Sequence, residues 1–225
     1  MLDWDCHRLT ELHRLLRDFS CPDTTSGHLL YYLDANGRYD SKDRLLRLLD
    51  HAAGIGALGR IVLLEEPFPE EYDLPVGDLP VRVAADESAH SAADVERRIA
   101  QGYRAIALKA VAKTFSMSLQ MLRTAHRAGI PCFCADLTVP PILLEWNRNL
   151  AARLAPLPDL RIGMLESNGA QLYRHWPQLL ALHPCPDATW LTPQAGTFLL
   201  DDDFYRTSGG MLLDAPRCRT RCEPA

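Results

Sequence analysis

The chain has 225 residues, enough for one domain with a full core, and its composition (47% hydrophobic, 24% charged) is that of an ordinary soluble globular protein. A net charge of -5 at pH 7 gives no indication of binding to nucleic acid or to an anionic membrane surface. No apolar run reaches the roughly 20 residues that span a bilayer, and the N-terminus lacks the features of a signal peptide, so we expect a cytoplasmic protein without membrane contact.

Helical patterns and short apolar runs alternate along the chain. The first helical pattern covers residues 5–19, where leucines recur at helical spacing. Ser41 and Ser91 are the expected N-caps of two later helices, and Gly102 and Gly129 stand where two helices should end. The expected helices are 5–19, 41–57, 92–101, 116–128, 142–154 and 172–182.

The apolar runs between these helices have the length of buried strands. Uninterrupted runs of this kind suit parallel strands that are covered on both faces. Since strand and helix alternate throughout, we expect an α/β fold built from about six strand–helix units. The expected strands are 28–33, 60–64, 81–85, 105–108, 130–135 and 161–165.

Each expected strand is followed directly by a charged residue. The intervals between these charges run from 21 residues (65 to 86) to 31 residues (34 to 65), and a (β/α)8 barrel uses roughly 31 residues for each strand–helix unit. Because the carboxyl ends of parallel strands meet at one rim, we expect the charges to face a common mouth. They are Asp34, Glu65, Asp86, Lys109, Asp136 and Glu166.

Three of these charges predict a metal site. Asp34, Glu65 and Asp86 follow consecutive strands, and carboxylates crowded together repel one another unless a cation lies between them. Oxygen ligands suit Mg2+, with Mn2+ as the alternative. Asn36 and Glu87 stand close enough in sequence to hold a ligand or a bound water in place. Any one of these carboxylates alone would be read as a helix cap or a solvated residue, whereas three on consecutive units favour a site.

The remaining charges are candidate catalytic groups. Lys109 follows the next strand, and a lysine beside a cation and partly removed from water can take a proton from carbon or return one. Its rival Lys113 is expected on the following loop. Asp136 and Glu166 could each hydrogen-bond a substrate, relay a proton or only cap the next helix.

At these residues the sequence resembles the mandelate racemase and muconate lactonizing group of the enolase superfamily, over roughly residues 5–180. By this resemblance Asp34, Glu65 and Asp86 are metal ligands, Lys109 is an acid/base at the sixth barrel strand, and Glu166 ends the eighth. The implied reaction removes a proton alpha to a carboxylate to give a metal-stabilised enediolate. The phrases that carry the resemblance are Asp34-Ala35-Asn36-Gly37, Glu65-Glu66-Pro67, Ala85-Asp86-Glu87-Ser88, Ala107-Leu108-Lys109 and Glu166-Ser167-Asn168-Gly169.

Parts of the complete family pattern are not found in this sequence. Family members carry an N-terminal capping domain and two further barrel strands, the second often ending in a Lys-x-Lys pair, which we do not find here. We therefore expect a truncated barrel domain at 1–182 and an irregular tail at 183–225 that would pack on the missing cap. The truncated barrel would have exposed strand edges, which favour a homo-oligomer or another association through those edges.

Three functions stay open at this point. The first is a Mg2+-dependent lyase or isomerase that racemises, epimerises or dehydrates a small carboxylate-bearing substrate, such as an acid sugar, an amino acid or a dipeptide. The second is a catalytically inactive remnant that binds only metal or a partner. The third is an aldolase that uses Lys109 as a Schiff-base nucleophile, although three carboxylates on the preceding strands argue against it.

Overall fold

The computed structural model describes residues 2–135 and 138–214, which divide into two compact units. The first unit runs to Leu108 and also takes in Ser116–Phe133 and Ala155–Met164. The second takes Lys109–Phe115, Cys134–Leu154 and the chain from Leu165 onwards. The helices and strands of each unit follow from local sequence.

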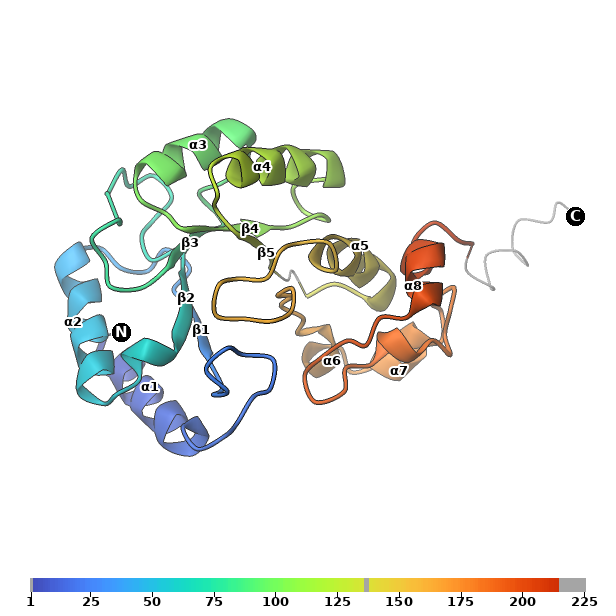
Figure 1. The fold of residues 1–225 in the computed structure, drawn as a ribbon, viewed down its shortest axis with the longest axis horizontal. Helices are drawn as coiled ribbons and strands as arrows, with labels where there is room; N and C mark the ends of the chain where they lie inside the picture. The colour runs from blue at the N-terminus through green and yellow to red at the C-terminus, as the bar shows by residue number, and fades with distance from the viewer. Residues whose placement is uncertain (1, 136–137, 215–225) are drawn as a thin grey trace, which may run out of the picture. The chain divides into compact units, whose positions relative to one another are not determined.

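The strands lie in one sheet whose spatial order is the order of the chain (Figure 1). β1 to β4 pair in parallel, and β5 follows β4 at the edge. Sequential parallel strands joined by helices are the arrangement of a β/α barrel, so the predicted fold class is confirmed. The strands are β1 (Tyr31–Asp34), β2 (Ile61–Glu65), β3 (Val83–Ala85), β4 (Ala105–Leu108) and β5 (Cys132–Cys134).

The core of the first unit follows from the apolar runs. Every residue of β2, β3 and β4 is buried, as expected for parallel strands covered on both faces. Leu45 and Leu49 of α2, Val95 of α3 and Met121 of α4 are buried against this core. The helices of this part of the chain are α1 (Leu2–Leu16), α2 (Lys42–Gly54), α3 (Ala92–Ala100) and α4 (Phe115–Arg127), with a short 3-10 turn, η1 (Leu58–Arg60).

The two predicted N-caps differ in their hydrogen bonds. The Ser91 hydroxyl accepts the backbone amide of Asp94 at 3.3 Å, so it caps α3 as predicted. Ser41 stands at the N-cap of α2 but makes no side-chain capping bond, and its hydroxyl donates to the Asp40 carboxylate instead. The start of α2 therefore depends on its buried leucines more than on a cap.

Two elements expected beyond residue 160 differ in the structure. The strand expected at 161–165 is wrong as an element, because only Leu165 pairs, in a single parallel bridge with Cys134. The helix expected over 172–182 is two short helices, and Pro177 opens the second. The helices are α5 (Pro141–Ala151), α6 (Gly169–Leu172), α7 (Trp176–Leu180) and α8 (Asp202–Thr207), with 3-10 turns η2 (Thr189–Leu191) and η3 (Ser208–Gly210).

A buried polar cluster joins α5 to the chain beyond residue 182. Arg148 donates to Glu145 Oε1, and His183 Nε2 lies 3.5 Å from the same oxygen, with all three side chains almost fully buried. Burial lowers the pKa of Arg148, although the Glu145 carboxylate opposes that shift. Gly209 is buried beside them, since a Cβ there would overlap Glu145 Oε2. Gly209 therefore belongs to the buried part of this unit, where a side chain would displace the Glu145 carboxylate.

Within residues 2–135 and 138–214, no helix combines the length and the hydropathy that a bilayer crossing requires.

Gly102, at the end of α3, should be intolerant of any side chain. Its φ is +97°, and an added Cβ would overlap the backbone of Gly77, whereas Gly129 has a φ of +69° with nothing within 4 Å. We expect Gly102→Ala to cost about 3 kcal/mol or more, roughly 6–12 °C in the midpoint of thermal unfolding. Gly129→Ala, which meets only the left-handed backbone penalty, should cost about 1 kcal/mol. Equal losses in the two variants would contradict the close approach.

Candidate active site

The carboxyl ends of β1, β2 and β3 bring acidic residues onto one face of the sheet. Asp34 pairs with Glu65 in the β1–β2 register, and Glu65 pairs with Ala84 in the β2–β3 register. Asp86 follows Ala84 by two residues, the interval at which a strand returns its side chains to the same face. Parallel pairing therefore brings these three strand ends next to one another.

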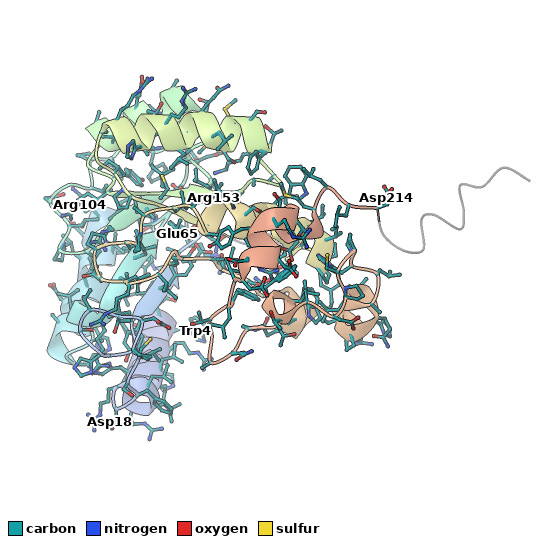
Figure 2. All side chains as sticks on the ribbon, turned by 45° about the vertical axis from the view of Figure 1, so that its right-hand side comes forward. Trp4, Asp18, Glu65, Arg104, Arg153 and Asp214 are labelled. Atoms are coloured by element: carbon teal, nitrogen blue, oxygen red, sulfur yellow. The ribbon has the colours of Figure 1, made fainter. Side chains whose placement is uncertain are left out.

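Three carboxylates form a tight group at this edge. Glu65, Asp86 and Glu87 each offer an oxygen, and these oxygens all lie within 4.8 Å of one another. Glu65 and Asp86 are 2% and 1% exposed, so water screens their charges poorly. Figure 2 labels Glu65 among the side chains at the end of β2. Carboxylate oxygens crowded in this way are the donors that Mg2+ or Mn2+ prefers, so the residues present fit such an ion.

Asp34 lies beside this group but is not a member of it. Its carboxylate is exposed and accepts the backbone amide of Asn36 at 2.9 Å and the Asn36 side-chain amide at 2.6 Å. Asn36 has a φ of +47°, a left-handed conformation that Asn tolerates well. Asn36 therefore hydrogen-bonds Asp34, while Glu87, predicted as an outer partner, stands with Glu65 and Asp86.

Glu66, the residue after Glu65, is a further acidic residue at this edge of the sheet. Its side chain is 1% exposed, and Oε2 accepts hydrogen bonds from the backbone amides of Asp86 (2.8 Å) and Ser88 (3.1 Å) and from the Ser88 hydroxyl (2.9 Å). Its position directly after a fully buried strand was the signal available in the sequence, because a charge there has little access to water.

A buried arginine supports the same segment from α3. Arg98 is 2% exposed, donates from Nε to the Ser88 carbonyl at 3.4 Å and from Nη1 to the Tyr72 carbonyl at 3.1 Å. Its guanidinium lies 5.5 Å from the centre of the Tyr103 ring. Burial, together with the nearby Glu66 carboxylate, raises the pKa of Tyr103 to about 12. Tyr103 therefore stays neutral at physiological pH.

A cavity of about 630 Å³ opens beside Asp34 in the first unit. Leu33, Leu48 and Leu64 contribute apolar surface, while Arg8 and Arg38 bring positive charge. Trp4, labelled in Figure 2, stands at the cavity and is 65% exposed. This volume falls in the range of small-molecule pockets.

Lys109 and Glu166, two of the predicted catalytic residues, belong to the second unit. Lys109 follows β4 directly, and its carbonyl accepts the amide of Lys113 at 2.8 Å, so Lys113 lies in the following turn as expected. Glu166 follows the Leu165 bridge, and its amide donates to the Cys134 carbonyl at 2.9 Å. Asp136 lies outside the described residues.

Comparisons with known proteins give a likeness in structure and none in sequence. No protein-family model matches the chain, and no curated protein matches it. Among solved structures, a mandelate racemase/muconate lactonizing protein from Herpetosiphon aurantiacus is 23% identical over 79% of this chain and 47% of its own, with a TM-score of 0.61. An enzyme described as a mandelate racemase/muconate lactonizing enzyme from Sorangium cellulosum is 24% identical over 78% and 45%, with a TM-score of 0.63.

A third structure, a dipeptide epimerase from Cytophaga hutchinsonii complexed with Mg and the dipeptide D-Ala-L-Val, is 19% identical over 77% of this chain and 44% of its own, with a TM-score of 0.59. These likenesses confirm the fold that the sequence motifs predict. The chain spans less than half the length of the solved structures that it matches.

The Asn36 conformation gives a test of the Asp34 loop. Asn36→Ala removes the side-chain hydrogen bond to Asp34 and places an alanine, which cannot form such a bond, at a φ of +47°. We expect this change to cost about 1–2 kcal/mol, roughly 2–8 °C in the midpoint of thermal unfolding. Asn36→Gly loses the same bond but accepts the backbone conformation, so its loss should stay below about 0.5 kcal/mol. Thermal unfolding in EDTA measures both, and equal losses would show that the bond to Asp34, not the backbone, stabilises the loop.

Proposed function

We propose that this chain belongs to the mandelate racemase/muconate lactonizing group of the enolase superfamily and works as a Mg2+-dependent isomerase or lyase. The reaction class is removal of a proton alpha to a carboxylate, followed by racemisation, epimerisation or elimination. The observation that carries the proposal is the buried carboxylate group at the ends of β2 and β3. The shared fold and the order of the strand-end motifs support it.

The proposed roles combine the strand-end positions with the family resemblance. Asp34, Glu65 and Asp86 would hold the cation, with Asn36 and Glu87 beside them. A bound Mg2+ supplies a Lewis acid that stabilises negative charge on a substrate carboxylate. Lys109 would take or return the proton at the alpha carbon, and Asp136 and Glu166 would contact the substrate.

The molecules bound by the structural neighbours suggest the kind of substrate. One neighbour is complexed with a dipeptide and another with muconolactone, and both ligands are small carboxylate-bearing molecules. We propose the same chemical class here, with Mn2+ as the alternative cation. The edge of β1, which has a strand on one side only within the described sheet, is the proposed surface for self-association.

Mg2+ affinity measured by calorimetry tests the ligand set. Asp34→Asn, Glu65→Gln and Asp86→Asn should each weaken binding by more than about 100-fold, because each removes a charged ligand, whereas Glu87→Gln should weaken it by about tenfold. Glu96→Gln, an exposed change on α3, is the matched control and should bind as the wild type does. A larger loss in Glu87→Gln than in Asp34→Asn would assign the third ligand to Glu87. Unchanged affinity in all four would contradict the site.

Solvent exchange tests the reaction. In D2O with Mg2+, the wild-type protein should incorporate deuterium at the alpha carbon of at least one member of a panel of acid sugars, amino acids and dipeptides, followed by proton NMR. Lys109→Met should abolish that exchange, and Lys113→Met, in the following turn, should retain most of it. A folded protein that binds Mg2+ but exchanges nothing would favour the non-catalytic remnant.

A further inference from the structure

Glu66 stands apart from the other acids at the sheet edge because of what its carboxylate does. Oε2 is saturated by three donors from the segment 86–88. Oε1 is buried without a hydrogen-bond partner among the described residues, and Glu66 is not a member of the group formed by Glu65, Asp86 and Glu87. The Glu66 carboxylate therefore faces the backbone of the neighbouring strand end.

These bonds determine where two members of the carboxylate group lie. The amides of Asp86 and Ser88 flank Glu87, so one acceptor oxygen fixes the backbone on both sides of that residue. Arg98 holds the Ser88 carbonyl from α3. Hydrogen bonds to a charged acceptor are about twice as strong as neutral ones, and in a buried place they restrict the segment most.

The backbone amide and the backbone carbonyl of Glu66 are both hydrogen-bonded. Its amide donates to the Ala84 carbonyl at 3.0 Å, and its carbonyl accepts the Gly37 amide. Its φ is +35°, an uncommon value for a residue with a side chain. Glu66 thus connects the loops that follow β1, β2 and β3.

We propose that Glu66 is a positioning residue that sets the spacing of Glu65, Asp86 and Glu87 by fixing the backbone of 86–88, without itself binding the cation. The consequence for metal binding rests on the proposed function. The anchoring of the segment does not, since it depends only on hydrogen bonds between residues of the chain itself.

Two substitutions separate position from charge. Glu66→Asp keeps the charge but withdraws the carboxylate by about 1.5 Å, which is enough to break bonds of 2.8–3.1 Å. Glu66→Gln loses the charge but keeps an acceptor oxygen in place. We expect Mg2+ affinity to fall by about tenfold or more in Glu66→Asp and by about threefold in Glu66→Gln. Glu71→Asp and Glu71→Gln, on the exposed loop nearby, are the matched controls and should not change it.

Amide hydrogen exchange in the metal-free protein gives a second readout. The amides of Asp86 and Ser88 should exchange at least about tenfold faster in Glu66→Asp than in the wild type, with a smaller change in Glu66→Gln. A greater loss of affinity in Glu66→Gln than in Glu66→Asp would overturn the proposal, because Glu66 would then act through its charge. Unchanged exchange in Glu66→Asp would overturn it as well. If the wild type binds no Mg2+, the proposed function fails, and the exchange rates alone decide the role of Glu66.

Discussion

The constraint on which the site depends is the crowding of like charges in a buried place. Two unit charges 4.8 Å apart repel by roughly 3.5 kcal/mol at an effective dielectric constant of 20. Repulsion of this order between neighbouring members of the group Glu65, Asp86 and Glu87 is a sizeable part of the stability of a domain, about 5–15 kcal/mol. Positive charge close to such carboxylates reduces their repulsion, and the divalent cation proposed for this site would bring two positive charges to it.

The sheet is what makes this crowding achievable. Glu65 and Asp86 are separated by 21 residues of chain, yet parallel pairing of consecutive strands brings their ends to one edge. The rest of β2 and β3 is apolar and buried, so the registers that align the ends are fixed by packing and ladder bonds. Stability therefore comes from the body of each strand, while the charged residues at the strand ends are available for the proposed site.

The contrast between apolar strand bodies and charged strand ends explains which features could be predicted from the sequence. Apolar runs identify five strands because burial on both faces leaves an unbroken pattern, and the spacing of their terminal charges identifies Glu65 and Asp86. The run at 161–165 contains Arg161 and Gly163, which pack poorly in a strand, and it forms only a bridge. The roles of Glu66 and Gly209 depend on contacts with Ser88 and Glu145, far along the chain, which no local pattern records.

Glu65 and Glu66 show how adjacent acids can divide two tasks. Glu65 ends β2 in register with Asp34, and one of its oxygens lies in the carboxylate group. Glu66 Oε2 instead accepts hydrogen bonds from the backbone at the end of β3. A cation site needs ligands at defined distances, and those distances are set by backbone that has its own hydrogen-bond partners. A second acid beside the first supplies that partner without adding a fourth charge to the group. In this proposal the two adjacent acids act together. Glu65 supplies a carboxylate oxygen to the group, and Glu66 holds the backbone that carries Asp86 and Glu87.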